Sequence, residues 1–322
     1  MRLLTVTGIQ KKLQPGFSLK NISFTQRRNE KVVIAGESGS GKTTLLKIVS
    51  GLLQPDKGTV LIDGERVAGP DETLVPGNPH IAYLSQNFEL PKFLRVEQVL
   101  AYANKLSDNE ATILFRVCEI GHLLKRDTRE LSGGERQRIA ICRLLTTKPK
   151  LLLLDEPYAH VDQAHKESLK RLIVGIGQQL GITCLLVSHD PADTLSWADR
   201  ILVLRHGSIV QQGTPAAIYN RPKDEYTAGL FGKYSLIIPE LQARLSGDTG
   251  RKPGRKPWIV RPEDLRIVST GKNALRGRVQ DIQFYGSTFE ARVELEGEVS
   301  VIVNTKNHGL KVGSTVYVAL SQ

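Results

Sequence analysis

Residues 36–43 read Gly-Glu-Ser-Gly-Ser-Gly-Lys-Thr, and this stretch with its flanking residues indicates the fold in which it lies. The β-branched run at 31–35 predicts a strand before it, and the helix-spaced apolar residues of 43–50 predict a helix after it. The stretch fits G-x-x-x-x-G-K-[ST], a loop whose backbone N–H groups cradle nucleotide phosphates. Because this pattern requires a strand before it and a helix after it, the sequence predicts a phosphate-binding loop in an α/β fold.

The residues of this loop have separate predicted roles. Glycines let the backbone approach an anion closely, and the N-terminus of the following helix favours negative charge. Lys42 is expected to contact the β- and γ-phosphates, and the hydroxyl of Thr43 is expected to bind Mg²⁺. The predicted ATP-binding residues are Gly36, Glu37, Ser38, Gly39, Ser40, Gly41, Lys42, Thr43 and Thr44.

Two further apolar runs, at 151–154 and 183–188, flank a stretch with helical periodicity at 163–180. Continuous apolar runs separated by a helix are typical of buried parallel strands. Helix-spaced apolar residues also recur within about 87–145, which predicts a helical subdomain there. The core is therefore predicted to be a mostly parallel sheet covered by helices.

The character of the chain changes after about residue 232. Residues 246–257 are rich in Gly, Pro, Lys and Arg and read as a flexible connection. Short segments beyond it alternate apolar and polar residues between glycines, which predicts a small all-β domain. The predicted boundaries are 1–235 for the nucleotide-binding domain, 236–257 for a linker and 258–322 for the β domain.

Composition limits the class of protein. A length of 322 residues predicts a core domain with an appendage. No stretch approaches the roughly 18 uninterrupted apolar residues of a membrane-spanning helix, so other chains would have to cross any membrane that this protein serves. The N-terminus lacks the apolar core of a secretory signal, which predicts a cytosolic location.

Charge and cysteines add two expectations. The net charge of +11 suits an anionic ligand, a nucleic acid or an anionic lipid surface, and it equally fits a merely basic soluble surface. The cysteines Cys118, Cys142 and Cys184 are widely spaced and lack metal-site spacing, so we expect free, buried thiols.

A second motif, Leu-Ser-Gly-Gly-Glu at 131–135, gives the glycine-rich loop its context. Together the two motifs resemble the ATP-binding cassette (ABC) ATPases, in which the Leu-Ser-Gly-Gly motif of one subunit closes over ATP held by its partner. The resemblance implies that hydrolysis requires a homodimer. The fifth position is a glutamate where the family usually has glutamine. The predicted signature residues are Leu131, Ser132, Gly133, Gly134 and Glu135.

The same resemblance assigns roles to polar residues that follow predicted strands. Asp155, after four leucines, matches the carboxylate that holds Mg²⁺ through water, and Glu156 matches the general base. Gln86 matches a glutamine that touches Mg²⁺ and the attacking water, and His189 matches a histidine that contacts the γ-phosphate. Catalysis is thus expected from Glu156, His189 and Gln86, and metal binding from Thr43, Gln86 and Asp155.

Other positions match the family less closely. Asp162 ends a segment that resembles the loop linking the two ATP sites across the dimer, but Ala159 replaces the usual hydroxyl residue and His160 is uncommon there. The aromatic residue that usually stacks on adenine is not evident. Its place falls near Leu13, and Phe17 is the nearest ring.

The C-terminal domain resembles the TOBE-type β-barrel of bacterial solute-importer ATPases. The whole chain thus resembles an ATP-hydrolysing importer subunit that uses ATP and Mg²⁺ at the cytoplasmic face of the inner membrane. The expected partners are a second ATPase subunit, two transmembrane permease subunits and a solute-binding protein, and ferric iron or polyamine is the favoured solute. Apolar residues after Gln86 are expected to line the permease groove or, alternatively, to pack within the helical subdomain: Phe88, Leu90, Pro91 and Phe93.

A soluble ABC ATPase acting on nucleic acid or ribosomes is the alternative function. The basic charge argues for it, and four residues in the predicted linker could contact phosphates. Such proteins usually carry a long coiled-coil insertion, zinc modules or two ATPase heads, and the sequence predicts none of these. We therefore expect no direct contact with nucleic acid, although the linker contains Arg251, Lys252, Arg255 and Lys256.

Overall fold

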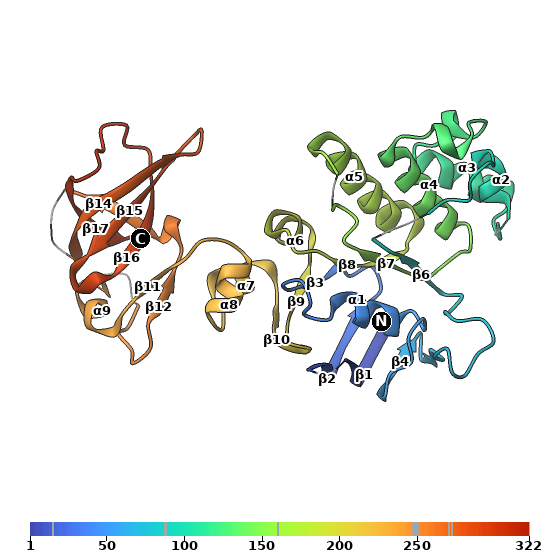
Figure 1. Cartoon of the computed structure of the whole chain (residues 1–322), viewed down its shortest axis with the longest axis horizontal. Coiled ribbons are helices and arrows are strands. Elements are labelled where there is room, and N and C mark those ends of the chain that lie inside the picture. The colour runs from blue at the N-terminus through green and yellow to red at the C-terminus, as the bar shows by residue number, and fades with distance from the viewer. Residues whose placement is uncertain are drawn as a thin grey trace. The chain divides into compact units, whose positions relative to one another are not determined.

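The computed structural model describes residues 1–14, 16–86, 89–102, 104–159, 161–246, 251–269, 271 and 273–321. Contacts divide the chain into two compact units, Met1–Pro215 and Ala216–Gln322 (Figure 1). Phe88 and His160 lie outside the described residues. Within the described ranges, the structure has no helix long and apolar enough to span a membrane.

A six-stranded sheet forms the centre of the N-terminal unit, with the strand order β10-β9-β3-β8-β7-β6. Five strands are parallel and only β10 is antiparallel to its neighbour, which confirms the predicted mostly parallel sheet. The bounds are β3 (Val32–Ala35), β6 (Ile81–Leu84), β7 (Leu151–Asp155), β8 (Thr183–Val187), β9 (Arg200–Arg205) and β10 (Ser208–Gly213).

Strand β7 shows why the central strands are apolar on both faces. Leu151 and Leu153 belong to one core with α1 (Lys42–Val49) and a second, antiparallel sheet. Leu152 and Leu154 face a different core with helices on the other side. A strand buried on both faces reads as a continuous apolar run. The antiparallel sheet has the order β2-β1-β4-β5 and comprises β1 (Arg2–Gln14), β2 (Phe17–Arg27), β4 (Lys57–Ile62) and β5 (Glu65–Arg66).

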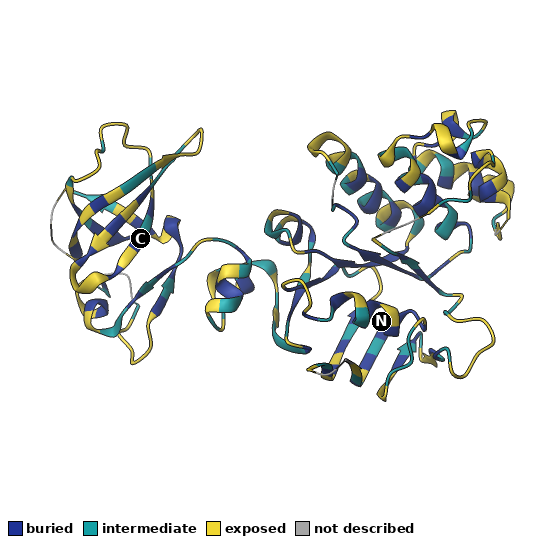
Figure 2. Cartoon of the chain, in the orientation of Figure 1, coloured by how far each residue is buried: buried dark blue, intermediate teal, exposed yellow. Residues whose placement is uncertain are grey.

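Helices occupy the segment between β6 and β7, as the sequence predicts. Figure 2 shows buried and exposed positions mixed along these helices, whereas the central strands are almost wholly buried. The three cysteines of the chain are free and buried, as expected. The helices are α2 (Val96–Ala101), α3 (Asp108–Val117) and α4 (Gly133–Leu145), with 3-10 turns at Gly121–Leu123 and Thr128–Glu130; α5 (Gln163–Leu180) and α6 (Pro191–Trp197) follow β7 and β8.

The C-terminal unit contains a five-stranded antiparallel sheet with the order β13-β17-β14-β15-β16. Its edge strands β13 and β16 contact each other, so the sheet curls into a barrel-like form and confirms the predicted all-β domain. The strands are β13 (Leu265–Val268), β14 (Ala274–Phe284), β15 (Phe289–Leu295), β16 (Ser300–Thr305) and β17 (Thr315–Leu320).

The segment before this sheet is packed onto it. The side chain of Arg261, only 3% exposed, donates hydrogen bonds to the carbonyls of Tyr219 and Ala228. The interval 236–257, where the sequence predicts a linker, contains a helix and most of a strand that pairs with β12. The division of the chain into two compact units places residues 216–235 with the β domain. The elements are α7 (Pro215–Asn220), α8 (Glu225–Leu230), β11 (Ser235–Ile237), α9 (Pro239–Ser246), β12 (Trp258–Val260) and a 3-10 turn at Pro262–Asp264.

Candidate functional site

The glycine-rich loop joins the end of β3 to the start of α1, and two of its glycines have no room for a side chain. A Cβ at Gly36 would lie 2.4 Å from the carbonyl oxygen of Leu204. Gly41 has φ of 105°, and a Cβ there would lie 2.6 Å from the side chain of Leu19. The loop can adopt this course only because both positions are glycine.

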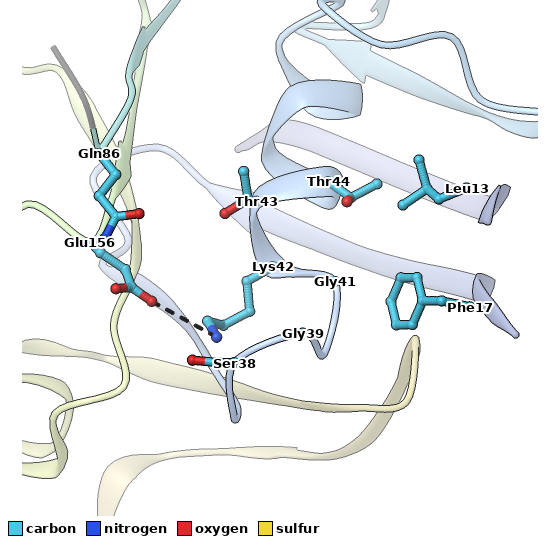
Figure 3. A pocket seen from close by; sticks show the side chains of 10 residues that line it. All are labelled: Leu13, Phe17, Ser38, Gly39, Gly41, Lys42, Thr43, Thr44, Gln86 and Glu156. Carbon is cyan, nitrogen blue, oxygen red and sulfur yellow. Dashed lines mark ion pairs between the residues drawn. The ribbon is translucent and has the colours of Figure 1, made fainter. Parts of the chain in front are cut away.

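A pocket of about 700 Å³ opens at this loop (Figure 3). Its volume falls within the range of small-molecule sites, about 300–1,000 Å³. Figure 3 shows Gln86 and Glu156 on one side of Lys42, with Leu13 and Phe17 at the opposite end. The lining residues are Leu13, Phe17, Ser38, Gly39, Gly41, Lys42, Thr43, Thr44, Gln86 and Glu156.

Lys42 is a buried cation at the floor of the pocket. Its Nζ donates to the carbonyl oxygens of Gly36 and Glu37, both at 2.9 Å, and lies 3.9 Å from Glu156 Oε1. Burial lowers the pKa of Lys42, although the nearby carboxylates oppose this shift. Ser40 Oγ is also buried, and it has no hydrogen-bond partner within the described part of the chain. A cation and an unpartnered hydroxyl in a glycine-rich loop suit the phosphates of a nucleotide.

Asp155 ends β7 and is 2% exposed. Its carboxylate accepts hydrogen bonds from the hydroxyl of Thr43 at 3.2 Å and from the hydroxyl of Tyr83 at 2.9 Å. Burial raises the pKa of Asp155, and these two hydrogen bonds oppose that shift. Mg²⁺ prefers hydroxyl, carboxylate and phosphate oxygens, so Thr43 and Asp155 together fit this ion beside a bound nucleotide.

Tyr83 is a residue that the sequence analysis missed. It lies on β6, which runs parallel beside β7 with Tyr83 opposite Leu153. Its position three residues before Gln86 could have drawn attention to it. The sequence does not show, however, that its hydroxyl reaches the carboxylate of Asp155.

Glu156 and His189 come together although they follow different strands. His189 Nδ1 lies 3.2 Å from Glu156 Oε2, and the backbone N–H of Glu156 donates to the carbonyl of Val187 at 3.1 Å. Glu156 has φ of 49°, a left-handed conformation that costs a non-glycine residue about 1–3 kcal/mol and is common at functional sites. The carboxyl ends of neighbouring parallel strands thus gather Asp155, Glu156 and His189 beside the loop.

The signature residues form the start of α4. Ser132 caps this helix in a reciprocal arrangement with Glu135: Ser132 N–H donates to Glu135 Oε2 at 2.8 Å, and Glu135 N–H donates to Ser132 Oγ at 3.3 Å. The first of these bonds lowers the pKa of Glu135. Leu131 is buried in the helical core, whereas Gly133 faces open space.

Gly134 lies close to the first turn of α5, because a Cβ at this glycine would lie 2.6 Å from the ring of His165. Asp162 caps α5, accepting from the N–H groups of Ala164 and His165 at 3.1 Å each. The hydrogen bond from the backbone of His165 lowers the pKa of Asp162. Neither Asp162 nor any signature residue is among the described residues that line the pocket.

Comparisons with known proteins agree for both parts of the chain. Residues 19–159 match the ABC transporter family, and residues 258–322 match the TOBE domain. The spermidine/putrescine import ATP-binding protein PotA of Clostridium acetobutylicum is 31% identical over 98% of this chain and 93% of its own length. The molybdate/tungstate import ATP-binding protein WtpC of Pyrococcus horikoshii is 34% identical over 98% and 96%. The Fe(3+) ions import ATP-binding protein FbpC of Pseudomonas fluorescens is 31% identical over 98% and 95%.

Solved structures give the same result. The structure of cbiO1 from Clostridium perfringens, part of the ABC transporter complex cbiONQ, matches with a TM-score of 0.59 and 27% identity over 68% of this chain and 91% of that chain. A dimeric ATP-binding cassette in a post-hydrolysis state, bound to ADP and Pi, matches with a TM-score of 0.56 and 27% identity over 66% and 99%.

Proposed function

This chain belongs to the family of ABC transporter ATP-binding subunits with a C-terminal TOBE domain, which makes it an ATPase, and we propose that it energises the import of a solute across a membrane. The observation that carries the proposal is the convergence of Lys42, Glu156 and His189 beside a glycine-rich loop. A loop and a cation that hold the phosphates, with polar side chains that can orient a water molecule, are the protein groups that phosphoryl transfer to water uses.

The loop residues 36–44 would hold the phosphates of the substrate, ATP. Lys42 would exchange its contacts with loop carbonyls for contacts with the β- and γ-phosphates. Thr43, Asp155 and Gln86 would hold Mg²⁺, which neutralises the charge of the phosphates during the reaction. Leu13 and Phe17 supply an apolar end of the pocket for the base, so base selectivity is expected to be modest.

Glu156 is placed to act as the general base. It directly follows the last residue of β7, and its carboxylate lies 3.9 Å from Lys42 Nζ and 3.2 Å from His189 Nδ1. It would orient and deprotonate the water that attacks the γ-phosphate. His189 would steady that water and contact the γ-phosphate, and its proximity to Glu156 supports this pairing.

The catalytic unit is proposed to be a homodimer. The signature residues 131–135 lie at the start of a helix and outside the pocket of their own chain, so a second copy is needed to bring them to the nucleotide. Ser132, Gly133 and Gly134 would face the γ-phosphate of the partner's ATP, and Asp162 would link the two sites. A dimeric ATP-binding cassette among the similar structures supports this arrangement.

We place the chain at the cytoplasmic face of the inner membrane, bound to two transmembrane permease subunits and served by a solute-binding protein. A second hollow of about 520 Å³ offers a site for a permease segment, with Leu52, Val75, Ala82 and Leu144 in its lining. Tyr83 also lines it and bonds Asp155, so this hollow adjoins the metal site. Two of the apolar residues after Gln86 differ in their surroundings: Phe93 is 70% exposed, and Leu90 packs on the helical core.

The solute is proposed to be ferric iron or a polyamine, since proteins named for these solutes are among the relatives. Molybdate is a further candidate on the same ground. The alternative function on nucleic acid draws less support. In the basic linker, Arg251 stacks on Trp258 at 4.6 Å and donates to the carbonyl of Ile259 at 3.1 Å, so part of the cluster is used internally.

Purification of the Glu156→Gln variant from native membranes in Mg-ATP tests this function. The proposal predicts that multi-span membrane proteins co-purify with the variant, and that their identity reveals the solute. Recovery of nucleic acid or ribosomes in their place would reject the transport function while leaving the ATPase assignment intact.

A further inference from the structure

Two lysines of α5 and two aspartates at the start of α6 form an ion cluster. Lys166 Nζ lies 2.6 Å from Asp190 Oδ2 and 2.8 Å from Asp193 Oδ2, and Lys170 Nζ lies 3.1 Å from Asp193 Oδ1. Asp193 is 1% exposed. Burying an unpaired carboxylate is costly, and the two lysines supply the counter-charges for Asp193. One contact, between Lys166 and Asp190, is not needed for that purpose.

Asp190 directly follows His189, and its position is fixed on several sides. One carboxylate oxygen accepts from the N–H of Ala192 at 2.8 Å and caps α6, while the other accepts from Lys166. The backbone N–H of Asp190 donates to Ser188 Oγ at 3.1 Å. Lys166 therefore connects this loop to α5.

The same helical turn of α5 also begins at the proposed dimer loop. Asp162 is the N-cap of α5, and the backbone N–H of Lys166 donates to the carbonyl of Asp162 at 2.9 Å. Residues four apart in a helix lie on the same face. A displacement of Asp162 would thus be transmitted through a single helical turn to Lys166 and from there to Asp190.

We propose that Lys166 is a positioning residue for ATP hydrolysis: its ammonium holds Asp190, and with it His189, in place beside Glu156. The inference rests on the proposed function, because it takes Glu156 and His189 as the groups that act on the attacking water. It adds a route within one subunit from the dimer loop to the histidine. Lys166 is not among the described residues that line the pocket, so it would act through Asp190.

Lys170 provides a matched control within the chain. It contacts the same buried aspartate, Asp193, and its other ion pair is with Glu167. Loss of either lysine removes one counter-charge from Asp193, so a purely structural cluster would respond similarly to both changes. Of these two lysines, Lys166 is the one that pairs with Asp190, the residue next to His189.

The test compares steady-state hydrolysis and ATP binding by the full-length protein in the Lys166→Gln and Lys170→Gln variants. We expect Lys166→Gln to lower kcat about 10-fold with KM and nucleotide affinity unchanged, since small misplacements of catalytic groups have large effects on rate. Lys170→Gln should keep kcat within about twofold, and Lys166→Arg should restore most of it, because both keep a cation beside the cluster. Equal kcat losses for the two glutamine variants, or no loss for Lys166→Gln, would overturn the proposal.

A second variant covers the case in which Lys166→Gln does not fold. Asp190→Asn keeps a good helix cap and leaves Lys166 on Asp193, yet it removes the ion pair. It should show the same selective loss of kcat, and an unchanged kcat would refute the positioning role. Glu156→Gln run in parallel separates the two claims: turnover by that variant rejects the proposed base, whereas its inactivity beside a normal Asp190→Asn rejects only the role of Lys166.

Discussion

The two units of the chain each bury a cation, and the two cations serve different ends. Arg261 in the C-terminal unit stacks on Tyr219 at 4.2 Å and donates to the carbonyls of Tyr219, Ala228, Gly232 and Lys233. Lys42 in the N-terminal unit has two carbonyl partners and also lines a pocket. A guanidinium saturated by backbone carbonyls holds structure, whereas an ammonium facing a cavity is available to an anion.

The sheets of the two units also differ in whether they serve a site or a core. In the parallel sheet, strand after strand ends at one edge, and the polar residues Asp155, Glu156 and His189 collect there. The antiparallel sheet of the C-terminal unit buries alternate aliphatic side chains such as Val293 and Val318 against one another. Polar residues that can do chemistry thus lie where parallel strands end, whereas the barrel-like sheet of the C-terminal unit packs an aliphatic core.

Loss of the pocket cation is expected to have the largest effect. Lys42→Ala should lower the affinity for ATP by about 100-fold or more, because a charge-assisted hydrogen bond contributes about 1.5–3 kcal/mol and two phosphates lose theirs. Isothermal titration with ATP measures this. Lys47→Ala, on the exposed face of the same helix, is the control and should bind normally. Normal ATP affinity in Lys42→Ala would mean that Lys42, like Arg261, has only a structural role.

Replacement of Arg261 should lower stability and leave ATP binding unchanged, the opposite of the result expected for Lys42. Arg261→Met should destabilise the C-terminal unit by about 3 kcal/mol, since several buried carbonyls lose their donor. Calorimetry should show a lower unfolding temperature for one transition only, with ATP affinity unchanged. A parallel loss of ATP binding would show that the two units do not unfold or function separately.

A smaller effect is expected from the hydroxyl that orients Asp155. Tyr83→Phe should weaken Mg²⁺ binding in the presence of ADP by about 10-fold, in keeping with the loss of other hydrogen bonds to metal ligands. Titration of Mg²⁺ into the ADP complex measures it. Tyr158→Phe removes a buried hydroxyl that has no partner in the described structure and should leave Mg²⁺ affinity unchanged. Equal results for the two variants would remove Tyr83 from the site.

The sequence predicted the parts of the site that depend on local signals. Glycines at 36, 39 and 41 and the leucines before Asp155 mark a loop and a buried strand wherever the rest of the chain lies. Glu156 and His189 were each expected just after an apolar strand, but their proximity also requires β7 and β8 to be neighbours in the sheet, which the sequence analysis did not predict. The roles of these residues in hydrolysis stay predictions.

Contacts that depend on register and helix packing could not be predicted in this way. The bond from Tyr83 to Asp155 requires β6 to lie beside β7 in one register. The pairing of Lys166 with Asp190 requires the start of α6 to lie beside α5. The sequence did contain a signal for helix α9, since Leu241 and Leu245 are spaced for one buried face. The predicted linker at 236–257 rested instead on the Gly- and Pro-rich residues that follow this helix.

We propose that Glu156 is the base of an ATPase site that a second copy of the chain completes. Hydrolysis and sedimentation of Glu156→Gln in Mg-ATP test it most directly. We expect turnover to fall about 100-fold or more, with ATP still bound and a dimer that persists, because the amide cannot take the proton from water. Undiminished turnover by a monomer would contradict it.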